Sequence, residues 1–320
     1  MVDATGTNKY TYTAAGRLFT EDGPWADDTV TNIYSNGMRV NMNLQMPGNP
    51  YQPTSPWTNQ FGYDAAKRLT SVTSPAGTFS YQYPVGTSST ASHYQKLLLP
   101  GGAYITNVYD GNARLLGTWL KTSGNTILDA SVYGYNAGNQ RTANTNATGT
   151  NILYKYDRIG QLKLADSSDN TEDRGYNYDA AWNLNQRTNA GTLQTFTVDG
   201  KNQLTYTPTG SVGYDGNGNM TYLPPATNGY SASSPTLTYD GENQLSSVVA
   251  NYMWKQEFVY DGKMRRRIRR EYTYSYPNWV LNNEVHYVYD GMRVIQERFS
   301  SSQTESYTRG VDLSGSLEGA

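Results

Sequence analysis

The sequence contains no cysteine, which excludes disulfide bonds, a thiolate nucleophile and cysteine-based zinc or iron–sulfur sites. It also lacks any run of about 18 consecutive apolar residues, so no transmembrane helix is predicted. The first twenty residues do not show the basic and then apolar order of a secretory signal peptide. The formal net charge is only -2, which argues against a broad electrostatic surface for nucleic acid or anionic lipid.

Aliphatic residues are also scarce. Leu, Ile, Val and Phe together account for 52 of the 320 residues, which disfavours the oily core of an α/β enzyme. Such a low value is typical of disordered chains only when the net charge is high, and here it is not. The main bulky residue is tyrosine, with 29 copies against 6 Phe and 6 Trp. Because tyrosine favours strands and keeps its hydroxyl near water or a partner, the composition predicts thin, half-exposed β-sheets.

A short motif recurs along nearly the whole chain. It consists of an aromatic residue, any residue, Tyr and Asp, followed by two or three small or polar residues, a polar or basic residue and an aliphatic one. Residues 61–69 read FGYDAAKRL, and residues 154–162 read YKYDRIGQL. The spacing between successive copies varies from 16 to 29 residues. This irregular period excludes a strict solenoid and fits hairpins joined by return loops of variable length.

Each copy is predicted to form a β-hairpin. The two aromatic rings lie two residues apart and therefore share one face of a strand. The aspartate suits a turn because its carboxylate accepts backbone N–H groups, and a later glycine such as Gly160 is free to take a positive φ. Asp-Gly dipeptides such as Asp110-Gly111 are a further hairpin signal. The residues that we assign to the structural repeat are Tyr12, Tyr63, Asp64, Tyr109, Asp110, Tyr135, Tyr156, Asp157, Gly160, Tyr178, Asp179, Tyr214, Asp215, Tyr239, Asp240, Tyr260, Asp261, Tyr289 and Asp290.

The repeat predicts an all-β fold in which successive hairpins form one extended, curved or spiralling sheet, as a partial shell or barrel. We expect residues 1–306 to be a single continuous array. A Pro-rich segment at about 45–58 is expected to leave the sheet, as is the loop between Pro224 and Pro235. Residues 307–320 are Gly-rich and differ in character from the array.

The repeated Tyr-Asp-x-x-Gly-Arg-Leu pattern resembles the YD repeat of RHS proteins, of the C subunits of bacterial Tc-type toxin complexes and of the teneurin shell. The Gly-rich segment 307–320 is similar to the start of the RHS-core junction, which stops short here. The resemblance implies a β-strand that spirals into a hollow shell around a C-terminal toxic polypeptide. It also implies a self-cleaving core with an Asp-Pro-x-Gly motif. The sequence contains no Asp-Pro dipeptide, so we predict no enzymatic activity.

The leading hypothesis is therefore a non-enzymatic shell segment of a secreted or cell-surface bacterial toxin, without cofactor or metal. Its expected partners are the toxic cargo and the remaining shell, and neither nucleic acid nor a membrane span is expected. The rival hypothesis is a carbohydrate- or cell-surface-binding adhesion module whose exposed rings stack on sugars. The tryptophans considered for that role are Trp57, Trp119, Trp182, Trp254 and Trp279. Open strand edges of a truncated spiral also predict that the isolated chain self-associates.

The basic run at residues 263–270 is typical of a nucleic-acid patch when its charge is considered alone. It directly follows a Tyr-Asp-Gly copy of the repeat, however, so strand alternation sends Arg265, Arg267 and Arg269 to one face and the residues between them to the other. A strand that divides its charges between two faces forms no single patch. We therefore predict a structural strand whose guanidinium groups stack on neighbouring tyrosine rings.

Candidate catalytic groups are few. The only histidines are His93 and His286, and no Gly-x-Ser-x-Gly motif accompanies them. The aspartates of the repeat all occupy the same turn position, and this repetition favours a structural role over a pair of catalytic carboxylates. No active site is therefore predicted.

Overall fold

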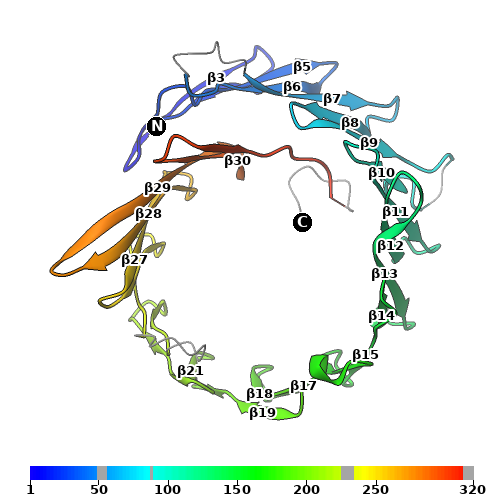
Figure 1. Ribbon diagram of the computed structural model, residues 1–320, viewed down its shortest axis with the longest axis vertical. Coiled ribbons are helices and arrows are strands. Elements are labelled where there is room, and N and C mark those ends of the chain that lie inside the picture. Colours follow the sequence, from blue (N-terminus) through cyan, green and yellow to red (C-terminus); the bar gives the residue numbers. More distant parts are fainter. Residues whose placement is uncertain (49–55, 87–88, 225–233, 313–320) are drawn as a thin grey trace.

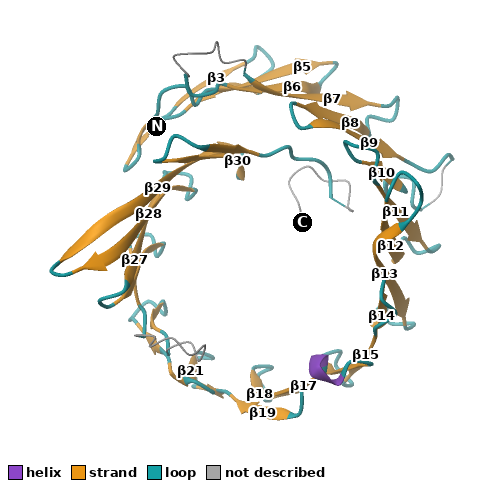
Figure 2. Cartoon of the chain, in the orientation of Figure 1, coloured by secondary structure: helices purple, strands orange, loops and turns teal. Residues whose placement is uncertain are grey.

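The repeated motif folds into β-hairpins that follow one another around a ring (Figure 1). The computed structural model describes residues 1–48, 56–86, 89–224 and 234–312. This described chain consists of strands and turns apart from the short 3-10 helix η1 (Asn170–Glu172) (Figure 2). Within the same residues, no helix is both long and apolar enough to cross a membrane. The prediction of an all-β, curved sheet of hairpins is confirmed.

The chain begins with a small hairpin of β1 (Val2–Asp3) and β2 (Gly6–Thr7), after which antiparallel pairings join consecutive strands from β3 to β19. The strands of this ladder are β3 (Lys9–Tyr12), β4 (Leu18–Asp22), β5 (Val30–Ser35), β6 (Met38–Leu44), β7 (Trp57–Tyr63), β8 (Leu69–Ser74), β9 (Gly77–Gln82), β10 (Lys96–Leu98), β11 (Tyr104–Tyr109), β12 (Leu115–Lys121), β13 (Ile127–Tyr135), β14 (Arg141–Asn146), β15 (Asn151–Tyr156), β16 (Leu162–Ser167), β17 (Arg174–Tyr178), β18 (Leu184–Asn189) and β19 (Thr192–Thr195).

The second half of the ring contains two further sheets. A short sheet is made of β20 (Thr197–Val198), β21 (Leu204–Thr207) and β22 (Gly210–Ser211). A longer one is made of β23 (Gly213–Tyr214), β24 (Met220–Tyr222), β25 (Thr236–Tyr239), β26 (Leu245–Ala250), β27 (Trp254–Tyr260), β28 (Arg266–Ser275), β29 (Asn278–Asp290), β30 (Arg293–Phe299) and β31 (Thr304–Ser306). The Pro-rich segment at 45–58 lies largely outside the described residues, as do residues 225–233 and 313–320.

Most copies of the repeat form the same turn, which Tyr63 and the residues after it illustrate. Tyr63 ends β7 and pairs with Leu69 across a β-bulge. The N–H of Asp64 donates to the Arg68 carbonyl, and the N–H of Lys67 donates to the Asp64 carbonyl. Lys67 has a φ of 64°. This is a three-residue loop in which a type I turn is followed by a left-handed bulge residue.

The left-handed residue is the fourth after the tyrosine, and Gly160 occupies that position with a φ of 93°. The glycines that directly follow the aspartate mark hairpins as predicted, but Gly111 and Gly262 do not take a positive φ. Their turns instead place Ala113 and Met264 in the left-handed region, both at 61°. The reason is that the first two loop positions of a type I turn have negative φ. The glycine after the aspartate is the first of these positions, and the left-handed residue is the third.

Substitutions at this left-handed position are expected to act in opposite directions. Trp182 has a φ of 71° and its side chain is 70% exposed, so Trp182→Gly should stabilise the chain by about 1 kcal/mol. Gly160→Ala should destabilise it by about the same amount, because its Cβ must adopt the same left-handed conformation. Urea unfolding of both variants measures the two effects. Changes of the same sign would contradict this account of the turn.

The apolar core lies where the two ends of the chain overlap. β30 passes inside β5 and β6 on one side of the ring (Figure 1). Val288 and Ile295 from the C-terminal strands join a buried cluster with residues of the N-terminal strands, among them Met42, Leu44 and Val72. Packing between two layers of sheet therefore joins the beginning of the described chain to its end.

Candidate functional site

In one copy of the repeat the direction of the aromatic rings can be assigned. Phe61 is part of the cluster that contains Val288 and Ile295, and Tyr63 packs against that cluster. The strand that carries Ile295 lies inside the ring (Figure 1). Both rings of this copy therefore point inward, as residues two apart on a strand must share a face.

The hydroxyl of a repeat tyrosine links its hairpin to the hairpin before it. In ten copies it donates a hydrogen bond, over 2.6 to 3.0 Å, to the carbonyl of the first or second residue of the return strand of the preceding hairpin. Tyr109 differs, because it donates to the Tyr94 carbonyl over 3.3 Å. The bonds run from Tyr34 to Leu18, Tyr63 to Arg39, Tyr83 to Leu69, Tyr135 to Leu115, Tyr156 to Arg141, Tyr178 to Leu162, Tyr214 to Leu204, Tyr239 to Met220, Tyr260 to Leu245 and Tyr289 to Arg266. Each is worth about 1 kcal/mol, and phenylalanine cannot supply it.

Val198 marks the copy of the motif that has no tyrosine. This residue occupies the position of the second aromatic but has no hydroxyl to donate. Its strand, β20, belongs to the short separate sheet and not to the ladder that ends at β19. A second break follows between β22 and β23, where Tyr214 does bond to Leu204, so the missing hydroxyl alone does not account for the breaks.

Where the residue after the turn is an arginine, it connects groups from two successive hairpins; several other copies have Gln or Asn there, such as Gln161 and Asn183. Arg68 Nε donates to Asp64 Oδ2 over 2.7 Å, and its Cζ lies 4.6 Å from the ring centre of Tyr83 in the next copy. Arg114 and Asp110 repeat the charged contact at 2.7 Å. Hydrogen bonds from the backbone and then the side chain of Arg114 hold the pKa of Asp110 below its ordinary value. Asp110 therefore acts as an ionised acceptor within its turn.

The seam where the two chain ends meet contains a buried ion cluster. The side chain of Arg265 is fully buried and contacts Glu21 at 2.5 Å and Asp261 at 2.7 Å. Arg267 lies 3.6 Å from Asp28. Although burial lowers the pKa of Arg265, its two carboxylate partners raise it above the ordinary value. Burial raises the pKa of Asp28.

The seam also contains contacts outside this cluster. Arg39 Nη1 donates to Asp290 Oδ1 over 2.7 Å. Arg298 donates to the carbonyls of Ala26 and Asp27 over 2.8 and 2.5 Å. These bonds connect residues more than 250 positions apart, so they hold the ring together at its seam.

The basic run stacks on aromatic rings as predicted. Arg266 Cζ lies 4.9 Å from the ring centre of Tyr287, and Arg267 Cζ lies 4.7 Å from that of Trp25. The acidic partners near the N-terminus were not predicted from the sequence. The excess of arginine in one strand was the available signal, because a buried guanidinium requires a carboxylate partner.

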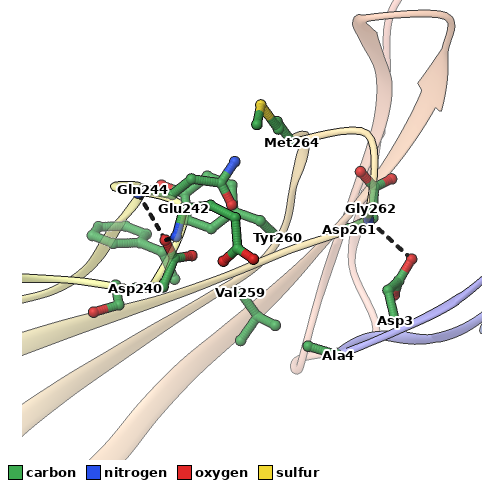
Figure 3. Close-up of a pocket in the computed structure, with 12 residues that line it drawn as sticks. Asp3, Ala4, Asp240, Glu242, Gln244, Val259, Tyr260, Asp261, Gly262 and Met264 are labelled. Atoms are coloured by element: carbon green, nitrogen blue, oxygen red, sulfur yellow. Dashed lines mark hydrogen bonds between the residues drawn. The ribbon is translucent and has the colours of Figure 1, made fainter.

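A shallow pocket of about 450 Å³ lies beside this seam, and Figure 3 shows its lining. Three of its four carboxylates, those of Asp3, Asp240 and Asp261, are hydrogen-bonded within the wall, and the fourth belongs to Glu242. Asp3 accepts the N–H of Gly262 over 3.2 Å, and Asp240 accepts the N–H of Gln244 over 2.8 Å. Asp261 holds Arg265, as described above. Asp3, Asp240 and Asp261 are thus structural acceptors, so the lining offers no pair of unbound carboxylates for acid–base chemistry.

The two histidines occupy separate sites. His286 stacks on Trp25 at 4.3 Å with its Nε2 2.7 Å from Glu284 Oε1, whereas His93 lies against Tyr109. In the part of the chain that the structure describes, no three His, Cys, Asp or Glu residues are grouped so as to hold a metal ion.

Of the tryptophans considered for sugar binding, Trp182 and Trp254 are exposed, at 70% and 40%. They lie in different sheets of the ring. Trp57, Trp119 and Trp279 are partly buried. The five therefore do not form a single exposed platform.

No protein-family model matches the sequence, and no curated protein matches it. Solved structures do share its fold. The TcdB2-TccC3-Cdc42 crystal structure matches with a TM-score of 0.54 and 17% identity over 95% of this chain and 20% of the other. The TcdB2-TccC3 crystal structure matches with a TM-score of 0.51 and 15% identity, over 93% of this chain and 21% of the other. The structure of the Photorhabdus luminescens Tc holotoxin pore matches with a TM-score of 0.52 and 15% identity, over 93% of this chain and 20% of the other.

The chain thus spans about a fifth of the length of the chains it matches. The structural similarity covers nearly all of this chain. It agrees with the resemblance of the repeated Tyr-Asp motif to the YD repeat. The chain therefore has the YD-repeat fold seen in the TcdB2-TccC3 structures of Tc toxin complexes.

Proposed function

We propose that this chain is a wall segment of a bacterial toxin shell, and that the wall encloses a toxic polypeptide together with further shell segments. The observation that supports this proposal is the seam. A sheet whose ends are joined by buried ion pairs and an apolar core forms an enclosure, whereas a binding platform needs no such closure. The role is mechanical, since the carboxylates of the wall serve as turn and seam acceptors.

The proposal includes a division of the chain. Residues 1–306 form the wall, and residues 307–320 lead toward a core junction. The complete toxin acts outside the bacterial cell, and the cargo and the remaining shell are its partners. The Tc complexes that share this fold support this assignment. An adhesion module is less well supported, because the exposed tryptophans do not gather on one surface.

Protection of an attached polypeptide tests the proposal. Asp312 is the last described residue, and the segment before it runs inside the ring (Figure 1). An unstructured protease-sensitive segment fused after Ala320 should therefore be cleaved about tenfold more slowly than the same segment fused before Met1. Gel analysis of timed digests measures both rates. Equal rates would argue against enclosure.

A further inference from the structure

Two neighbouring turns form an exposed projection that the enclosure does not use. The hairpin of β28 and β29 extends outward from the ring, away from the inner wall (Figure 1). The turn between β26 and β27 lies beside it, and the N–H of Tyr274 donates to the Met253 carbonyl over 3.0 Å. We call residues 252–254 together with residues 274–281 the aromatic tip.

The side chains of the aromatic tip are unusually exposed for their size. Tyr276 is 88% exposed and Tyr252 is 77% exposed. Trp254, Val280 and Leu281 are exposed at 40%, 48% and 47%. Single exposed apolar residues are common on proteins, but a contiguous group at the end of a projecting arm indicates a contact surface.

The aromatic tip carries no charge. Residues 272–283 read YTYSYPNWVLNN, and residues 250–254 read ANYMW. The nearest cation in sequence, Lys255, is held by Glu257 over 2.7 Å and lies 4.1 Å from the ring centre of Tyr272. A partner recognised by charge, such as an acidic peptide or a nucleic acid, therefore has nothing here to bind.

The ring geometry also disfavours a sugar. Tyr252 and Tyr274 meet at an interplanar angle of 77°, with centres 5.2 Å apart. Tyr274 and Trp279 meet at 68° and 5.1 Å. Rings packed edge to face cover one another and do not offer the coplanar faces on which a sugar chain would stack.

We propose that the aromatic tip inserts into the interfacial region of a zwitterionic lipid bilayer. Tyrosine and tryptophan favour this region because they combine an apolar ring with a polar group at its edge. A convex, uncharged tip can enter it without anionic lipid, and Val280 and Leu281 add apolar area. The tip lies on a different surface from the inner wall, so the proposal stands apart from the enclosure of a cargo.

Flotation of the 320-residue chain with phosphatidylcholine vesicles tests this proposal. The wild-type chain should float with the vesicles. The double variant Tyr252→Ser/Tyr276→Ser should partition at least about tenfold more weakly, because two exposed rings are lost. The matched control is Trp182→Ser, which removes an exposed ring from a different hairpin and should bind as wild type. Circular dichroism of each variant checks that the sheet is intact.

Salt and self-association distinguish the other outcomes. Binding should be unchanged between low and high salt, and it should shift tryptophan emission to shorter wavelength as Trp254 enters the bilayer. Failure to bind phosphatidylcholine, or binding that the double variant retains, would overturn the proposal. So would binding that requires anionic lipid and is lost in salt. If the double variant instead abolishes self-association without any vesicle binding, the tip is a protein contact and the lipid proposal is wrong.

Discussion

Arg265→Ala is expected to destabilise the chain by about 3 kcal/mol, because it removes the closest cation of the buried Glu21 and Asp261 and leaves them only the longer contacts to Lys263, at 3.9 Å, and Arg267, at 3.7 Å. The side chain of Arg265 is inaccessible to solvent, so its two carboxylate partners lie in a buried site where the loss of a cation is costly. Arg269 is the matched control. It lies four residues further along, in β28, but is partly exposed and pairs with Glu271 at 3.1 Å, so Arg269→Ala should change stability by less than about 1 kcal/mol.

Urea unfolding followed by circular dichroism measures the difference between these two arginines. Adding Glu21→Gln to Arg265→Ala should recover part of the loss, because the second change removes one unpaired buried charge. Equal effects of the two single substitutions would show that the buried cluster does not hold the seam. An additive double variant would show that Arg265 and Glu21 are not energetically coupled.

Leu44→Ala and Ile295→Ala are each expected to destabilise the chain by about 2 to 5 kcal/mol through the cavity they leave. Both side chains are buried, at 0% and 1% exposure, and they belong to the same core although they are 251 residues apart. The matched control Leu153→Ala removes a leucine that is 44% exposed on the wall, and it should have a much smaller effect.

The same two variants test whether the seam stabilises both ends of the chain. Because Leu44 and Ile295 share one core, the two substitutions should loosen the same contact and accelerate proteolysis near both ends of the chain. Thermal unfolding of each variant measures the loss of stability, and timed proteolysis measures the cleavage rate near each end of the chain. Faster cleavage confined to the end that carries the substitution would mean that the two layers do not stabilise each other.

The sequence was informative about each hairpin because the signals are local. Residues 154–162 illustrate this. Their two aromatic rings, two residues apart, predict a strand and the face that the rings share, and the aspartate and Gly160 predict the turn that follows. The tyrosine excess was correctly linked to the repeat. The hydrogen bond from Tyr178 to the Leu162 carbonyl was not foreseen, because it depends on how one hairpin is placed against the preceding one.

The seam could not be predicted for a related reason. Glu21 and Arg265 are 244 residues apart, and their meeting depends on the accumulated curvature of all the hairpins between them. A small change of twist in each hairpin would place these groups far from one another. A spacing rule therefore finds the strand that carries Arg265 and its direction, but not its partner. The aromatic tip was similarly hidden, since Tyr252 and Tyr274 meet only because two turns are placed side by side.

The short sheet β20–β22 gives the ring an uneven stiffness. At Val198 the wall has no tyrosine bond to the preceding hairpin, and the strands here contain only two to four residues. The seam, on another part of the ring, is tied by buried charges and an apolar core. A ring under load bends where its wall is most compliant, so an applied force should bend the sheet around Val198 before it opens the seam.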